Sequence, residues 1–232
     1  MKIAIINFSG NVGKTTIARH LLSPRLPKAH LLSVESANAD DGEMDALKGK
    51  QFAQLQEAMQ ITDDLIVDIG ASNIEDMLSG MQKYQGSHED FDFFVVPTVS
   101  DVKQQRDTAN TIEKLAAIGV DAPRMRIVLN RVDDSMPIEQ QFGMLQKFLD
   151  ATAVCAFNPA CALSENEIYQ RVKHDSRSIN DLAADTTDFK SLIAKANSTA
   201  DKIKLADGLA IKRLAAGVLP QLNQCYTALA FT

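Results

Sequence analysis

The sequence predicts an α/β fold, with a mostly parallel sheet that carries helices on both faces. Strand-length apolar runs alternate with segments of helical spacing, the runs are apolar at nearly every position, and a glycine-rich loop joins the first run to the first helical segment. Runs that are apolar throughout are typical of strands buried on both faces, as in parallel sheets. With 232 residues, the chain is long enough for one such domain with a large core and too short for two sizeable ones.

The strands and helices are expected in alternation up to residue 174. Apolar runs such as Phe93-Phe94-Val95-Val96 predict strands at 2–7, 30–34, 64–69, 91–97, 125–130 and 153–157. Apolar residues at helical spacing, such as Ile112, Leu115 and Ile118, predict helices near 14–23, 43–60, 72–85, 101–119, 138–150 and 164–174.

The C-terminal segment has a helical pattern without a strand. From about residue 188 a stripe of apolar residues follows helical spacing, and Gly208, Gly217 and Pro220 interrupt it. Because proline and glycine weaken helix interiors, we expect one long or broken helix followed by a short last one. We therefore predict a single domain over 1–232, with 188–232 as a helical extension packed on it.

A glycine-rich loop occupies the position where a parallel sheet binds phosphate. It has the sequence Ser9-Gly10-Asn11-Val12-Gly13-Lys14-Thr15-Thr16 and lies between the first strand and the first helix. Glycines let the backbone approach phosphates closely, and the amides at the helix N-terminus point toward the anion. Lys14 adds a cation, and the Thr15 hydroxyl suits a bound Mg²⁺. We prefer a nucleoside triphosphate site over an ordinary glycine-rich turn.

The loop resembles that of the ParA/MinD family of P-loop ATPases, the deviant Walker A sequence Lys-Gly-Gly-Val-Gly-Lys-Thr-Thr. Six of the eight positions match, and Ser9 and Asn11 are the exceptions. The longer stretch from Asn7 to Thr16 is similar to plasmid StbB-like stability and conjugation proteins. The resemblance implies an ATPase that binds ATP and Mg²⁺ through the whole loop, hydrolyses ATP slowly, and acts as a nucleotide-dependent switch in plasmid partition, stability or conjugation. It also implies a partner protein of that system.

Ser9 stands where the family has the lysine that reaches across a dimer interface to the partner's nucleotide. Without that lysine, we expect a homodimer that is weak or depends on a partner. Lys103 and Arg106, in the segment 101–107 that borders the interface in the family, could supply the missing cation.

Asp68 is the second candidate for the nucleotide site, as the metal-binding Walker B residue. It ends the apolar run Leu65-Ile66-Val67, so its carboxylate is expected at the sheet edge where ligands of α/β sheets bind. There it can hold Mg²⁺ through water together with Thr15. The alternative is an ordinary aspartate that caps the next turn.

Catalysis is predicted to use Lys14, Asp68 and Asp40. In the family, an Asp-x-Asp pair after the second strand helps to position the attacking water. Here Glu35 matches the first acidic position, but Ala37 occupies the second, so Asp40 or Asp41 could serve only if the loop is shifted. A solvated acidic loop is the alternative, and it would leave slow hydrolysis or none.

Asn130 and Arg131 end the fifth predicted strand, where the resemblance implies contact with the adenine base. A plain strand-end asparagine is the alternative. The sequence Asn130-Arg131-Val132-Asp133 differs from the guanine-specific Asn-Lys-x-Asp signature by one basic substitution. We expect a preference for adenine over guanine.

Composition limits the partners. The net charge of −6 and pI near 5.2 argue against wholesale coating of nucleic acid, so DNA contact would be local or indirect. Lysines in the C-terminal helical segment are offset by aspartates, which favours a solvated helix face. Residues Leu219–Thr232 contain no Lys or Arg, and no apolar stretch has the length of a membrane span, so no membrane attachment is expected.

Three scattered cysteines indicate a reducing, cytoplasmic environment. Two other functions stay open at this point. One is a nucleotide-binding scaffold without turnover, and the other is an ATP-dependent small-molecule ligase or kinase of the same fold.

Overall fold

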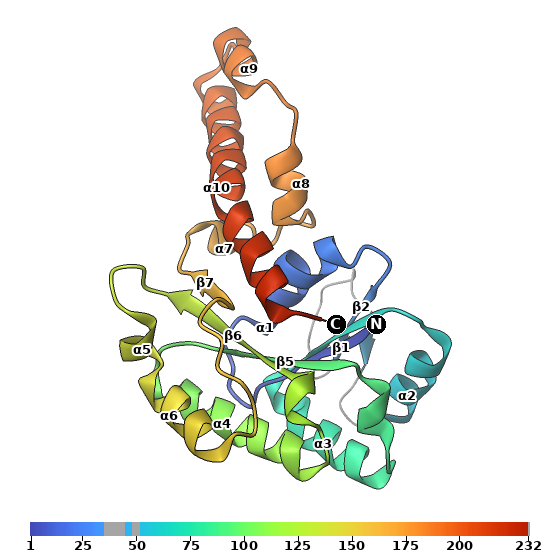
Figure 1. Ribbon diagram of the computed structural model, residues 1–232. Coiled ribbons are helices and arrows are strands. Elements are labelled where there is room, and N and C mark those ends of the chain that lie inside the picture. Colours follow the sequence, from blue (N-terminus) through green and yellow to red (C-terminus); the bar gives the residue numbers. More distant parts are fainter. Residues whose placement is uncertain (35–44, 48–51, 232) are drawn as a thin grey trace.

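A seven-stranded parallel sheet forms the centre of the protein (Figure 1). The computed structural model describes residues 1–34, 45–47 and 52–231, and at 45–47 it describes the strand alone. In spatial order the strands are β3 (Asp45–Leu47), β2 (His30–Val34), β4 (Leu65–Ile69), β1 (Lys2–Ile5), β5 (Phe93–Thr98), β6 (Met125–Val132) and β7 (Ala162–Ser164). Every pair in this sheet is parallel, which confirms the predicted fold class.

Helices cover both faces of the sheet. One face carries α2 (Phe52–Ile61), α3 (Ile74–Lys83), α4 (Val102–Ala117), α5 (Ile138–Gln141) and α6 (Gly143–Thr152). The other carries α1 (Lys14–Thr16), its π-helical continuation η1 (Ile17–Leu22), α7 (Ile168–Arg171), α8 (Ile179–Ala184) and the C-terminal part of α10 (Thr199–Leu229). The short α9 (Phe189–Lys195) precedes α10, and 3-10 turns occur at Ser23–Arg25, Ala71–Asn73, Ser87–Asp90 and Ala122–Arg124.

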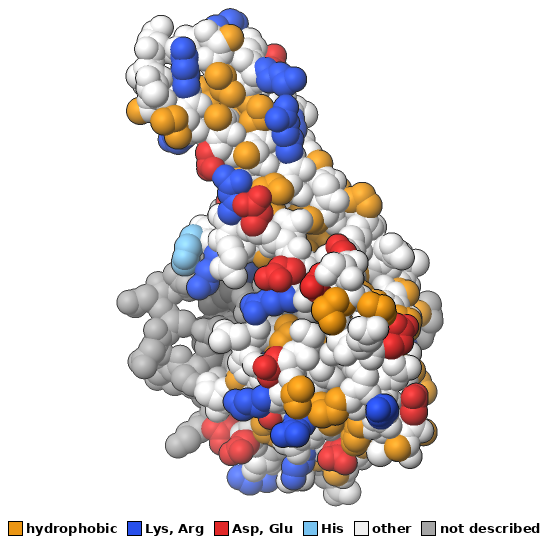
Figure 2. Space-filling model, turned by 90° about the vertical axis from the view of Figure 1, so that its left-hand side faces the viewer, with side chains coloured by type: hydrophobic (Ala, Val, Ile, Leu, Met, Phe, Trp, Pro, Cys, Tyr) orange, Lys and Arg blue, Asp and Glu red, His pale blue; other side chains and the backbone are white. Residues whose placement is uncertain are grey.

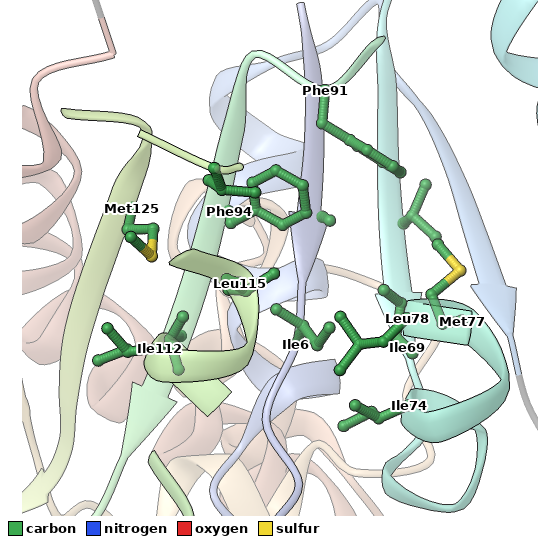
Figure 3. Packing of buried hydrophobic residues seen from close by; sticks show 14 of the residues in the cluster. Ile6, Ile69, Ile74, Met77, Leu78, Phe91, Phe94, Ile112, Leu115 and Met125 are labelled. Atoms are coloured by element: carbon green, nitrogen blue, oxygen red, sulfur yellow. The ribbon is translucent and has the colours of Figure 1, made fainter. Parts of the chain in front are cut away.

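Strand β1 shows why the core has two halves. Its neighbouring side chains point to opposite faces of the sheet, so Ala4 and the following Ile6 join one apolar cluster while Ile3 and Ile5 join the other. Figure 3 shows the first cluster, in which side chains from α3 and α4 close over Ile6 and Phe94. The centre of the sheet is thus buried on both faces, as the continuous apolar runs predict.

The prediction of a strand at 153–157 is wrong. Ala153 ends α6 in the left-handed conformation, and the following segment is irregular although Cys155 is buried. The ladder position beside β6 belongs to Ala162–Ser164 instead. An apolar run can therefore fill the core without pairing in the sheet.

Two predicted helices are also wrong in extent. The prediction at 43–60 includes Asp45–Leu47, which pairs with β2 as the edge strand β3, and the described helix begins only at Phe52. The prediction at 164–174 begins on the last residue of β7, and only Ile168–Arg171 is α-helical there. In both places, strand pairing at a sheet edge overrides the local helical pattern.

The C-terminal segment is divided differently from the prediction. The short helix, α9, comes first, and α10 then runs through Gly208, Gly217 and Pro220 as one helix. At Gly208 an added Cβ would lie 2.7 Å from Cε1 of Phe189, so this glycine lets α9 pack closely on α10. The helix tolerates Pro220 where Val218 and Leu222 are buried against the body.

The N-terminal half of α10 and the whole of α9 project from the sheet as an arm (Figure 1). No residue of 199–214 is buried, whereas Ala215, Val218, Leu222, Cys225 and Leu229 are buried below the arm. Figure 2 shows Lys and Arg side chains on the arm with hydrophobic side chains between them. Among the described residues, no helix is both long enough and apolar enough to cross a membrane.

Candidate functional site

The predicted phosphate loop lies at the carboxyl end of β1, in the middle of the sheet. It leads directly into α1, whose N-cap, Gly13, makes no side-chain capping bond. The amides of the first helical turn are therefore not capped by a side chain. Amides at a helix N-terminus favour a bound anion, so the position suits phosphate.

Lys14 lies inside the loop. It is 8% exposed, and its Nζ donates to the backbone carbonyls of Asn7 and Ser9 at 3.0 and 2.8 Å. Burial lowers the pKa of Lys14 from 10.5 to about 8, while the nearby Asp68 carboxylate acts in the opposite direction. The ammonium is thus held between two backbone carbonyl oxygens of this segment.

Thr15 and Asp68 meet at the carboxyl ends of the central strands. The Thr15 hydroxyl donates to Oδ2 of Asp68 at 2.6 Å, and Asp68 is 2% exposed at the end of β4. A hydroxyl and a carboxylate are oxygen ligands of the kind that Mg²⁺ prefers, directly or through water. The pair therefore fits a Mg²⁺ bound beside the phosphates.

Gly13 and Asn130 fix the turn of the loop. Gly13 has φ 91°, which favours glycine, and a Cβ there would lie 2.2 Å from Nδ2 of Asn130. The same Nδ2 donates to the carbonyl of Val12 at 2.9 Å. Asn130, which was predicted to contact the base, is 4% exposed. Its side-chain amide nitrogen holds it to the loop.

The start of the loop is anchored to two threonines of α4, Thr108 and Thr111, that belong to none of the sequence motifs. The side-chain Nδ2 of Asn7 donates to Thr108 Oγ1 at 2.7 Å and to the Pro97 carbonyl at 2.8 Å. The Phe8 amide donates to Thr111 Oγ1 at 3.1 Å. In the sequence, the signal for these contacts is the helical spacing of polar residues in α4. That spacing does not show which part of the chain the polar face contacts.

The remaining loop residues differ in exposure. Ser9, in place of the family lysine, is 4% exposed, and its amide donates to Oδ1 of Asn7 at 2.8 Å. Gly10 and Asn11 are exposed, and Asn11 has φ 58°, a conformation that only a few residue types adopt readily. Thr16 is half-buried in the first helical turn.

Arg131 is an exposed bulge in β6. Its φ is 52°, and the pairing of β6 with β7 shifts register between Asn130 and Val132. A bulge at a strand end changes the direction in which the chain leaves the sheet. Arg131 is exposed at this bulge, and the preceding residue, Asn130, contacts the phosphate loop.

The described residues do not include every predicted site residue. Asp40, Asp41, Glu35 and Ala37 lie outside the described residues.

The sequence matches no protein-family model and no curated protein. Solved structures of similar fold include apo McdA from Cyanothece, with TM-score 0.53 and 13% identity over 92% of this chain and 98% of that chain. A Cyanothece McdA variant in complex with ATP has TM-score 0.50 and 14% identity, over 94% and 96%. The MinD cell division protein of Aquifex aeolicus has TM-score 0.51 and 12% identity, over 94% and 97%. The chain therefore has a ParA/MinD-like P-loop fold.

Proposed function

We propose that this protein binds ATP and Mg²⁺ at the loop Ser9–Thr16 and acts as a nucleotide-dependent switch. The observation that carries the proposal is the contact of Thr15 with Asp68 at 2.6 Å beside the buried Lys14. A cation, a hydroxyl and a carboxylate in this arrangement match the three tasks of a triphosphate site, which are charge neutralisation, metal binding and orientation. Their position at the carboxyl ends of parallel strands, where ligands of α/β sheets bind, supports the proposal.

Each residue has a defined task in the proposed site. Lys14 would exchange its bonds to the carbonyls of Asn7 and Ser9 for bonds to phosphate oxygens, which are stronger because both groups are charged. Thr15 and Asp68 would hold Mg²⁺, which neutralises charge between the terminal phosphates. Asp40 is proposed to help position the attacking water.

Adenine is the proposed base. Asp133, the residue that could accept hydrogen bonds from guanine, has its Oδ1 occupied by the amide and hydroxyl of Ser135, at 2.8 and 2.6 Å. These bonds lower the pKa of the Asp133 carboxyl. An exposed carboxylate keeps further acceptor sites when one oxygen is bonded, so the preference for ATP over GTP is proposed from the loop resemblance and from Arg131 in place of the signature lysine.

The cellular role is proposed from the loop resemblance. We infer a cytoplasmic ATPase of plasmid partition, stability or conjugation, similar to StbB-like proteins, that works with a partner protein of the same system. Because Ser9 is buried and carries no charge, a dimer of this chain would lack the cation that the family's lysine provides across the interface. DNA contact is proposed to be indirect.

The test is to measure the size of the purified chain by sedimentation with ADP, ATP and a slowly hydrolysed ATP analogue, and phosphate release in parallel. A switch predicts slow hydrolysis and a size or partner affinity that differs between ATP and ADP. A scaffold without turnover would bind ATP and release no phosphate. An ATP-dependent ligase or kinase would instead release phosphate or ADP only when a small-molecule substrate is added.

A further inference from the structure

An open groove lies between α4 and α6 on the outside of the protein. The two helices pack side by side (Figure 1), and the groove between them has a volume of about 300 Å³. Both helices contribute to its apolar lining, which consists of Ala109, Met144, Leu145 and Phe148. Leu145 is buried and the other three are half-buried, so part of this apolar surface is exposed to solvent. A groove of this kind suits a helix laid along it.

A stripe of α4 forms one side of the groove and continues beyond it at both ends. Its residues follow one another at intervals of three or four positions, so they lie on one face of the helix. In chain order, the α4 stripe is Val102, Arg106, Ala109, Asn110, Glu113 and Ala117. Every member is exposed except Ala109, which is half-buried. Val102 is 52% exposed, so an apolar side chain at the start of the stripe is left in water.

The α4 stripe has the same chemistry when it is read from either end. Its centre lies between Ala109 and Asn110, whose side chains are small. Arg106 precedes this pair by three residues and Glu113 follows it by three, so opposite charges lie at equal distances from the centre. An apolar residue stands at each end. Two copies of α4 that pack antiparallel about a two-fold axis through this centre therefore bring each arginine against the glutamate of the other copy.

The two charges of the stripe are available for such a contact. In the parts of the chain that the structure describes, neither Arg106 nor Glu113 forms an ion pair. Two turns of helix, roughly 10 Å, separate them, which is too far for the two to pair within one chain. Exposed ion pairs add little affinity, so covering the apolar groove would supply most of the binding, and the two ion pairs would set the register.

We propose that the α4 stripe is a self-association surface, on which a second copy of this chain packs its own α4 antiparallel across a two-fold axis. The pairing covers Val102 and the apolar lining of the groove, and Ala109 lets the two helices approach closely at the centre. A second copy is favoured over another protein because the charges of the stripe complement each other within this chain. None of these residues belongs to the loop Ser9–Thr16, so the inference goes beyond the proposed function and does not depend on it.

The test is sedimentation of the full chain without nucleotide over a range of concentrations. Arg106→Glu and Glu113→Arg each bring like charges together twice, because the two-fold axis repeats every contact. The double variant, Arg106→Glu with Glu113→Arg, restores two opposite pairs with the charges exchanged. Lys190→Glu and Glu167→Arg are matched controls, since they make the same changes of charge at exposed positions away from the α4 stripe.

The parent is expected to show a reversible equilibrium between monomer and dimer. Each single reversal should raise the dissociation constant about tenfold or more, while the double variant should return to within about threefold of the parent. The controls should match the parent, and circular dichroism verifies that every variant is folded. Because this pairing needs no nucleotide, ATP-dependent association is measured separately, as the further change when ATP is added.

Three results would overturn the inference. The first is a parent that stays monomeric up to about 0.5 mM, which would leave the groove to a different protein. The second is a dimer that both single reversals leave unchanged. The third is a dimer that the single reversals weaken and the double variant does not restore, because the two charges would then not face each other.

Discussion

In the proposed nucleotide site, Lys14 is the residue whose charge would decide how tightly the loop holds phosphate. Its pKa in the protein is lowered to about 8 because the side chain is buried. Bound phosphate stabilises the ammonium, so the pKa of Lys14 is higher in the complex than in the free protein. Binding above this pH must then take up a proton.

We therefore expect ATP affinity to be independent of Lys14 titration below pH ~8 and to fall by up to about tenfold per pH unit above it. Calorimetry in buffers of different ionisation enthalpy measures the proton uptake directly. Constant affinity and no proton uptake between about pH 7 and 9, roughly one unit either side of the pKa of Lys14, would show that Lys14 does not meet the phosphates.

Thr15 provides a second test at the residue scale. Thr15→Ala removes the hydroxyl that contacts Asp68 at 2.6 Å, while Thr15 itself is exposed and carries little of the core. The variant should lose about tenfold in ATP affinity when Mg²⁺ is present, and little when Mg²⁺ is chelated. Titration of ATP with and without chelator measures both values. An equal loss in both conditions would remove Thr15 from the metal site.

At the residue scale, the sequence predicts the loop motif but not the residues that hold the loop in place through hydrogen bonds. Gly13, Lys14, Thr15 and Asp68 are recognisable because their chemistry is tied to a local pattern after a strand. Asn7 contacts Thr108, and Gln141 contacts Gln105, across distances in sequence that no local pattern encodes. Asn130 was expected to face adenine, and its bond to the Val12 carbonyl depends on how β6 lies relative to the loop.

At the scale of elements, α10 has an exposed N-terminal half, which belongs to the arm, and a C-terminal half that packs on the sheet. Leu222 is 1% exposed, whereas Ile203, on the same helix, is 65% exposed. Leu222→Ala should lower the free energy of unfolding by about 2–5 kcal/mol, because it leaves a cavity against the sheet. Ile203→Ala should change it by less than about 0.5 kcal/mol.

Urea unfolding followed by circular dichroism measures both changes in α10. Similar losses in the two variants would mean that the exposed and the buried halves of α10 contribute equally to stability, contrary to this description.

The strands of the centre were predictable because each is a continuous apolar run. The edge strands β3 and β7 were not, because three-residue strands carry little pattern and depend on a neighbour for pairing.

For the whole molecule, the buried, uncharged Ser9 predicts that ATP alone does not produce a stable dimer. Two nucleotides that face each other repel unless cations lie between them. Lys103 and Arg106 are exposed on α4, the helix that anchors the loop through Thr108. Any ATP-dependent dimer, alone or with a partner, should therefore weaken in Lys103→Ala or Arg106→Ala.

Sedimentation with ATP measures this self-association. Glu113→Ala, an exposed change on the same helix, serves as the control. A strong ATP-dependent dimer of the parent that is unaffected in both cationic variants would contradict the account of the interface.

The most direct test of the central claim is equilibrium binding of Mg²⁺-ATP to the parent and to Lys14→Ala, with unfolding followed in parallel. The account predicts saturable binding of one ATP per chain in the parent and a loss of about a hundredfold or more in the variant, since a charge-assisted contact to the phosphates is removed. The folded state should persist in both. Equal ATP affinity in the parent and in a folded Lys14→Ala variant would contradict the claim that this loop is the nucleotide site.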